Sequence, residues 1–424
     1  MAHLNLTGFG EELKKLEYKD NLAWFVRYID INELWRAQPT YVISQIVFII
    51  GALLTLTHAL KRGGRWPWLW FATILHGMVV ETISYNLPDI DNFWHSQTTI
   101  MFLGGRLPIH IVVLYSVFIY HASYAVSRLQ LPAWAEPFAV GLTVVLIDIP
   151  YDIVAVKFVH WTWHDTDPNI FDRHYWVPWN SYYFHSTFAA SFTFFFHISR
   201  KLFNSKSKKW QSAGFVKEFV CMTITGLLGM PGGVCLFLPI YHPLHDFGKV
   251  HSEVTFFIIF VIFLTISWSG DRTQRITEKL KVDWVDWALI LHLISHYGIY
   301  LAFTIWAYPE NEVSIGYHEP VGPCNNKVSL TTAFGSVIPK REFLCVEDYD
   351  EDYFDFKCLP KGKTPKHGSA WYTVCGTPFR NRCEYVAVLG TICLTAFAVF
   401  YNYYFRTVNS NNKKSNENKK IKIN

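Results

Sequence analysis

The stretch IDIPYDIVAVKFVHWTWHDTDP, residues 147–168, places two carboxylates inside an apolar run. Asp148 and Asp152 lie among Ile, Val and Ala residues, and a dense cluster of Trp, His and Asp follows them. An apolar block of about twenty residues is long enough to cross the hydrocarbon core of a bilayer as a helix. The stretch therefore predicts a membrane helix over 134–156 that keeps acidic side chains at membrane depth.

Similar apolar blocks recur along the 424-residue chain, which is 51% hydrophobic and 17% charged. Soluble domains usually carry about 25% charged residues. We therefore expect an all-α integral membrane fold, a polytopic bundle of about nine transmembrane helices. The predicted spans are 41–60, 67–87, 108–127, 134–156, 181–199, 215–240, 252–269, 284–307 and 385–405.

The charge of the loops predicts the orientation of these spans. Lys and Arg gather in 61–65, 200–217, 271–281 and the tail after 406, which all fall on one side of a nine-span bundle. Because cytosolic loops collect basic residues, the C-terminus is predicted to be cytosolic and the N-terminus lumenal or extracellular. Asn5 begins an N-x-T sequon on the predicted lumenal side, so it is a candidate glycosylation site.

The last residues, KKIKIN, place Lys420 and Lys422 at the spacing of a dilysine retrieval signal. Such a signal favours the endoplasmic reticulum or early secretory pathway over the plasma membrane. The alternative is an ordinary basic, Asn-rich disordered tail. We expect membrane lipids as partners and no nucleic acid, and the sequence assigns no cofactor and no oligomeric state.

The chain divides into five predicted parts: a lumenal amphipathic segment (1–40), an eight-span core (41–307), a lumenal loop (308–384), a ninth span (385–405) and a disordered basic tail (406–424). Proline, glycine and charged residues in the loop predict a small insertion with little core. Five of the eight cysteines lie there, in a compartment where disulfides persist. Four of them could form two bridges of unassigned pairing, and the fifth would be free or would pair elsewhere: Cys324, Cys345, Cys358, Cys375 and Cys383.

Ionisable residues within the predicted spans are the candidate site. An Asp at the centre of a membrane helix costs about 2.5–3.5 kcal/mol on insertion scales, so such residues usually face a bundle interior or a cavity. Asp148 and Asp152 are spaced i, i+4 and share one helix face. Topology brings the candidates to a similar depth near the lumenal side, in a pocket with an aromatic rim: Glu81, His76, Arg106, Asp148, Asp152, Trp161, Trp163 and His185. The alternative is that each Asp hydrogen-bonds a neighbouring helix.

Two histidine pairs are candidates for a metal site. His160 and His164 are spaced i, i+4, and His242 and His245 are spaced i, i+3. Such spacing can place two imidazoles on one helix face. The alternative is that they are interfacial side chains among Trp residues.

The pattern Asp148-x-x-x-Asp152, Trp161-x-Trp163 and VPWN ending at Asn180 resembles the bacterial and archaeal carotenoid-hydratase-like membrane family, over about 66–200. That family has an early acidic residue, which Glu81 would match. The resemblance implies protonation of an isoprenoid double bond and capture of the carbocation by water. Over its whole length the chain resembles an uncharacterised animal family of multipass membrane proteins known only as a domain of unknown function.

Three functions remain open at this point. The first is acid–base chemistry, a hydration or isomerisation, on a lipid or isoprenoid, with Glu81, Asp148, Asp152 and His185 as catalytic groups. His76, Arg106, Trp161, Trp163 and Asn180 would then bind the substrate. The second is a proton- or ion-coupled transporter or channel that uses the same buried groups. The third is a membrane scaffold or receptor-like protein that acts through the 308–384 loop.

Overall fold

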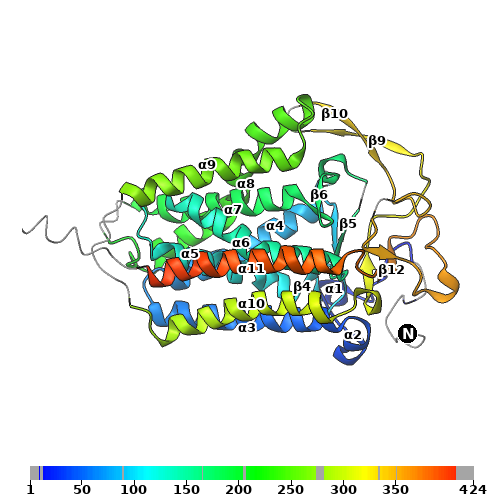
Figure 1. The fold of residues 1–424 in the computed structure, drawn as a ribbon, viewed down its shortest axis with the longest axis horizontal. Coiled ribbons are helices and arrows are strands. Elements are labelled where there is room, and N and C mark those ends of the chain that lie inside the picture. The colour runs from blue at the N-terminus through cyan, green and yellow to red at the C-terminus, as the bar shows by residue number, and fades with distance from the viewer. Residues whose placement is uncertain are drawn as a thin grey trace, which may run out of the picture.

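The computed structural model describes residues 9, 13–87, 90–164, 166–203, 207–273, 281–332, 335–349 and 351–406. Its long helices run side by side as a bundle, and a smaller part built of short strands and loops covers one end (Figure 1). We call this part the cap, and the two ends of the bundle the cap end and the far end. The predicted sites at Asn5, Lys420 and Lys422 lie outside the described residues.

Long helices follow the apolar blocks of the sequence closely. They are α3 (Pro39–Arg62), α4 (Trp66–Asn86), α5 (Ile109–Ser127), α6 (Glu136–Lys157), α7 (Trp179–Ile198), α8 (Phe215–His242), α9 (Ser252–Thr273), α10 (Trp284–Trp306) and α11 (Arg382–Phe405). Seven of them are long and apolar enough to cross a membrane, so the chain is a multipass membrane protein. The other two, α4 and α7, are 21 and 20 residues long. Their His, Glu, Trp, Tyr and Ser residues lower the mean hydropathy, so these two predicted spans are not established by composition.

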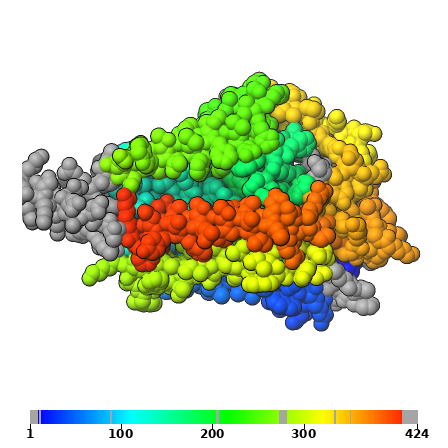
Figure 2. Space-filling view, in the orientation of Figure 1, coloured from blue at the N-terminus to red at the C-terminus, as the bar shows by residue number. Residues whose placement is uncertain are grey.

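The middle of the bundle is formed by α5 and α6, whose side chains are buried on nearly every side. In contrast, α9 and α11 turn many large apolar side chains outward. Figure 2 shows α11 running along the surface between α9 and α10. Asp148 and Asp152 on α6 are both fully buried. The two carboxylates are therefore surrounded by protein, as an ionisable residue at membrane depth requires.

The N-terminal segment is divided, although its apolar residues follow a near-helical spacing. Helix α1 (Asn21–Phe25) gives way to strand β1 (Val26–Tyr28), and α2 (Ile31–Ala37) begins after Asp30. The Asp30 carboxylate accepts a hydrogen bond from the Asn32 backbone N–H at 2.9 Å, which caps α2. Large apolar side chains stay exposed through the segment: Leu22, Trp24, Phe25, Tyr28, Ile31 and Trp35.

Short strands make the all-α expectation wrong for the cap. They are β1, β2 (Phe93–His95), β3 (Ile100–Phe102), β4 (Leu107–Pro108), β5 (Trp161–Trp163), β6 (Arg173–His174), β7 (Val177–Pro178), β8 (Val313–Tyr317), β9 (Lys327–Thr331), β10 (Val337–Arg341), β11 (Phe354–Asp355) and β12 (Trp371–Gly376). They pair in the orders β1-β3-β4, β11-β12-β8, β2-β5, β9-β10 and β6-β7. Single helical turns complete the connections: η1 (Pro168–Ile170), η2 (Ser199–Phe203), η3 (Pro243–Phe247), η4 (Pro309–Asn311) and η5 (Pro360–Gly362).

The cap has a substantial core, so the expectation of a loop with little core is wrong. Trp371 and Tyr372 on β12 are buried, and so is Tyr353, whose hydroxyl donates to the Trp163 backbone carbonyl at 2.6 Å. Two disulfides join Cys324 to Cys345 and Cys358 to Cys375. Cys383, at the start of α11, is free and exposed. The prediction of two bridges is thus confirmed, and the structure supplies the pairing and leaves Cys383 as the free thiol.

Candidate functional site

A cavity of about 610 Å³ lies in the cap half of the bundle, between α4, α7 and α8 and beneath β5 and β9. This volume is within the range of small-molecule sites, about 300–1,000 Å³. Much of its wall is apolar and aromatic. Six of the residues predicted for the site line it: His76, Glu81, Trp161, Trp163, Asn180 and His185. The cavity can therefore hold an apolar molecule against ionisable groups.

Glu81 is buried in the cavity wall near the cap end of α4. The Tyr85 hydroxyl donates to Oε2 at 2.7 Å, and the Tyr115 hydroxyl donates to Oε1 at 2.9 Å. Nε2 of His95 lies 3.7 Å from Oε2. Two donors and a nearby imidazole stabilise the charged form of the carboxylate. Glu81 is thus arranged as a fixed negative charge beside an apolar space.

Asp148, Asp152 and His185 form a second ionisable group at the same wall. Nε2 of His185 lies 3.6 Å from Oδ1 of Asp148, and the Ser181 hydroxyl donates to Oδ2 of Asp152 at 2.9 Å. Both oxygens of Asp148 and Oδ1 of Asp152 are buried and lack a hydrogen-bond donor among the described residues. Ser181 and His185 line the cavity, whereas the two carboxylates lie directly behind them. The order and direction of the predicted spans had placed Asp148, Asp152 and His185 near one another.

Arg106 does not belong to the cavity wall, contrary to expectation. Its guanidinium bonds Asp91 at 2.5 Å and stacks on the Tyr85 ring, 4.7 Å from the ring centroid. Tyr85 in turn donates to Glu81. Arg106 therefore supports the cavity from behind Tyr85 and does not face a substrate.

The first pair of histidines predicted as metal ligands, His160 and His164, does not point toward a common metal position. Nε2 of His160 lies 2.8 Å from the Thr40 hydroxyl, and burial lowers the pKa of His160 to about 3. His164 contacts His318 inside the cap, at 3.3 Å. The i, i+4 spacing of the first pair fails because α6 ends at Lys157 and the following residues turn into β5, so no helix face carries both rings.

The second pair, His242 and His245, contacts one carboxylate, that of Asp246. Nδ1 of each ring lies within hydrogen-bond distance of Asp246, at 2.8 and 3.0 Å. His245 also approaches Asp172, at 3.8 Å. Asp246 therefore accounts for both imidazoles, and we assign no metal to them.

Comparison with protein families shows which family the chain belongs to. The family described as a domain of unknown function (DUF7802) matches residues 14–405, nearly the whole chain. The chain belongs to this family. No significant match was found among curated proteins or among solved structures. Membership of an uncharacterised family is thus confirmed, whereas its animal origin and the resemblance to carotenoid hydratases stay predictions.

Sequence reasoning missed several side chains that contact the ionisable groups at the cavity of this DUF7802 protein. Tyr85 and Tyr115 hold Glu81, His95 approaches it, and Ser181 orients Asp152. Tyr85 is spaced i, i+4 from Glu81 on one helix, a signal that the sequence does contain. The other contacts join distant segments, and no local pattern marks them.

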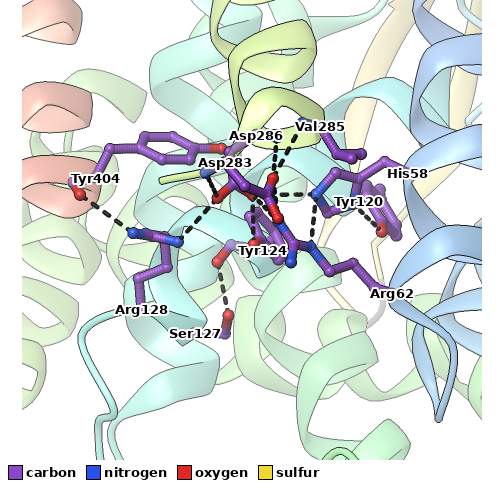
Figure 3. Close-up of polar contacts among 10 residues, drawn as sticks. All are labelled: His58, Arg62, Tyr120, Tyr124, Ser127, Arg128, Asp283, Val285, Asp286 and Tyr404. Atoms are coloured by element: carbon purple, nitrogen blue, oxygen red, sulfur yellow. Dashed lines mark hydrogen bonds and ion pairs between the residues drawn. The ribbon is translucent and has the colours of Figure 1, made fainter. Parts of the chain in front are cut away.

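A second buried polar cluster lies at the far end of the DUF7802 bundle (Figure 3). Oδ1 of Asp286 accepts hydrogen bonds from the Tyr124 hydroxyl at 2.5 Å and from Arg62 at 2.6 Å. His58 lies 3.3 Å from the same atom, and Arg128 donates to Oδ2 at 3.4 Å. Arg128 also bonds a backbone carbonyl of α11. The hydrogen bonds and ion pairs of this cluster join α3, α5, α10 and α11 to one another. We therefore assign the cluster a structural role, that of holding these helices together, and call it the clamp.

Proposed function

We propose that the protein is a membrane enzyme that performs acid–base chemistry, a hydration or an isomerisation, on a lipid or isoprenoid held in the cavity. One observation carries the proposal. An apolar space of about 610 Å³ has Glu81 in its wall together with His185, and Asp148 and Asp152 lie directly behind His185. Apolar walls suit a hydrocarbon chain, and the ionisable groups suit proton transfer at one point along it.

The chemistry would begin with proton transfer to one carbon of a double bond from the cluster of Asp148, Asp152 and His185. The tertiary carbocation that results would lie beside the fixed charge of Glu81 and near the rings of Trp161 and Trp163, which line the cavity. Attack by water on the cation, with return of one proton to the cluster, gives an alcohol. Loss of a proton from the neighbouring carbon gives the isomer and also restores the cluster.

The proposal includes the membrane topology expected from loop charge. All nine long helices, α4 and α7 included, would cross the bilayer, with the cap lumenal and the far end cytosolic. The cavity would then lie in the lumenal half of the membrane, and Asn5 would be glycosylated. Residence in the endoplasmic reticulum or early secretory pathway completes this proposal. Exposed aromatic residues of the N-terminal segment at the cap end support an interfacial position there.

Lipid analysis of cells that express matched variants tests the proposal. Wild-type protein is expected to change the amount of one lipid relative to empty cells, and Asp148→Asn or Asp152→Asn is expected to abolish the change. Asp271→Asn is the matched control, because Asp271 pairs with Arg406 at the far end. The proposal fails if no lipid changes, or if the Asp148→Asn and Asp152→Asn proteins act like wild type.

A row of buried histidines favours a second candidate function, proton-coupled transport. Nε2 of His121 lies 3.1 Å from Nδ1 of His292, and the two rings stack. His296 follows one turn later, with Nε2 2.9 Å from the Ile147 carbonyl, next to Asp148. His58 in the far-end cluster extends the row toward the other side. Chains of this kind relay protons in pumps and transporters.

Proton flux into proteoliposomes separates the two candidates. Transport predicts a flux that the wild type supports and that His292→Gln abolishes, whereas the enzyme predicts no such flux. The scaffold role expected for residues 308–384 stays a prediction.

A further inference from the structure

We propose that Asp148, Asp152 and His185 hold a divalent metal ion, and that the ion is zinc, which takes imidazole and carboxylate ligands. One ligand atom from each of the three residues lies within 4.8 Å of the others. The inference rests on the proposed function for its chemical role: water bound to the ion would donate and accept the proton that we assign above to the cluster.

Two neighbouring helices bring the ligands together. Asp148 and Asp152 project from the same face of α6, one turn apart, and His185 comes from α7, which packs closely along α6. Nε2 of His185 and Oδ1 of Asp148 are 3.6 Å apart. Tetrahedral ligands bound at about 2.0–2.1 Å lie about 3.3 Å from each other, so this pair is already close to the spacing that a bound ion requires.

Burial and charge are the second reason. Both carboxylates are fully buried, and three of their four oxygens lack a hydrogen-bond donor among the described residues. Within that same part of the chain, the basic side chain paired with Asp148 is His185, and no Lys or Arg pairs with either carboxylate. Leaving two desolvated carboxylates without a cation is costly. A divalent ion would neutralise both charges and occupy the free oxygens.

Second-sphere contacts and access fit a catalytic ion. The Ser181 hydroxyl donates to Oδ2 of Asp152 and so leaves Oδ1 of that carboxylate for the metal. Such partners orient ligands in metal sites. Catalytic zinc takes three protein ligands and keeps a fourth position for water. Since Ser181, His185 and Val144 line the cavity, the fourth position would open toward a bound lipid.

One water molecule would then supply both parts of a hydration. Held by Asp148, Asp152 and His185, the ion would supply a bound water that is both the acid for the double bond and the source of the oxygen that captures the carbocation, so that one water would add H and OH across the bond. The step needs no oxidant, reductant or further reactant.

The test is metal analysis of the full-length protein, purified in detergent without chelator. We expect about one zinc ion for each wild-type chain. Asp148→Asn and His185→Gln should lower the affinity for zinc by more than about tenfold, because even the loss of second-sphere partners weakens metal sites by about 10–100-fold, and the purified variants should contain much less zinc than the wild type. Glu81→Gln is the matched control: it removes an acidic group from the same cavity outside the ligand set, so zinc should be retained.

Cobalt substitution keeps the test decisive if a variant fails to fold. Wild-type protein stripped with a chelator and loaded with Co²⁺ should show the strong visible absorption of tetrahedral Co²⁺, and added Zn²⁺ should remove it. Wild-type protein without zinc that also takes up no Co²⁺ overturns the inference, as does zinc retained in Asp148→Asn and His185→Gln. Lipid conversion by metal-free protein would overturn this inference alone, and bound zinc without any lipid change would overturn the proposed function alone.

Discussion

Nε2 of His185 on α7 lies 3.6 Å from Oδ1 of Asp148 on α6. This contact connects a residue of the cavity wall to a carboxylate that the wall conceals. Asp148 itself does not line the cavity. His185, which does, is therefore the side chain through which Asp148 can act on a bound molecule. The functional proposals therefore depend on the packing of α6 against α7.

Replacing Glu81 with Gln removes the fixed charge beside the cavity. We expect turnover of the lipid substrate to fall by about 10²–10³-fold, the usual cost of removing one group that stabilises charge in a transition state. Tyr115→Phe removes one hydrogen bond to Glu81 and should lower turnover by about tenfold, as expected for a bond to a charged group worth about 1.5 kcal/mol. Product formation in isolated membranes measures both, with Tyr401→Phe on the exposed face of α11 as control. Wild-type turnover in Glu81→Gln would refute this role.

Stability of the far end is expected to depend on Asp286. Asp286→Asn leaves Arg62 and Arg128 without their shared buried carboxylate, and removal of one partner of a buried ion pair typically costs about 3–5 kcal/mol. Asp283→Asn is the control. Asp283 is half exposed and caps α10, and Asn also caps helices well, so we expect a cost below about 1 kcal/mol. Denaturant unfolding in detergent measures both, and equal losses would refute the clamp.

Stability should fall with rising pH because of Glu312, which is buried where the cap meets α3. The Thr40 backbone N–H donates to Oε1 at 3.3 Å, and burial raises the pKa of Glu312 from 4.5 to about 8. Between these values the folded protein keeps a proton that the unfolded chain has lost. The free energy of unfolding therefore decreases as pH rises through this window. Glu312→Gln should flatten the slope, measured as the unfolding midpoint at several pH values. Parallel wild-type and variant curves would contradict the assignment.

The cysteine pairing predicts which thiols react. Alkylation of unfolded, unreduced protein should label four cysteines: Cys221, Cys235, Cys383 and Cys393. Removing the Cys358–Cys375 bridge with a pair of Ala substitutions should cost about 3 kcal/mol of cap stability, as expected for a loop of this length. Cys383→Ser should change neither stability nor the other bridges. Peptide mapping that finds Cys383 in a disulfide would contradict this pairing.

Much of the membrane fold could be predicted because a helix of spanning length needs a continuous apolar block. The predicted spans 134–156 and 284–307 differ by one or two residues from α6 and α10. The strands of the cap could not be predicted. They are two to six residues long, and β2 pairs with β5 across more than sixty residues of sequence. Pairing at that distance is decided by tertiary packing, which no local pattern reveals.

For the candidate site, too, some relationships between residues could be predicted from the sequence and others could not. Asp148 and Asp152 share a helix face because they lie inside a helix, so their spacing predicted their relationship correctly. His160 and His164 have the same spacing, but Val159 has a φ of 50°, and the chain leaves the helix before both histidines. Spacing predicts a shared face only where the helix continues. Arg106 contacts Tyr85 beside the site, but its ion pair with Asp91 turns it away from the cavity.

The central claim, that the cavity binds a lipid, is tested most directly by mass spectrometry of lipids that stay with the purified protein. Wild-type protein should retain one lipid class well above its share of the membrane. Ser84→Phe, which puts a ring into the cavity wall, should lose it, whereas Leu53→Phe on the exposed face of α3 should retain it. Wild-type protein that retains no particular lipid, or Ser84→Phe protein that holds as much of it as wild type, would contradict the account.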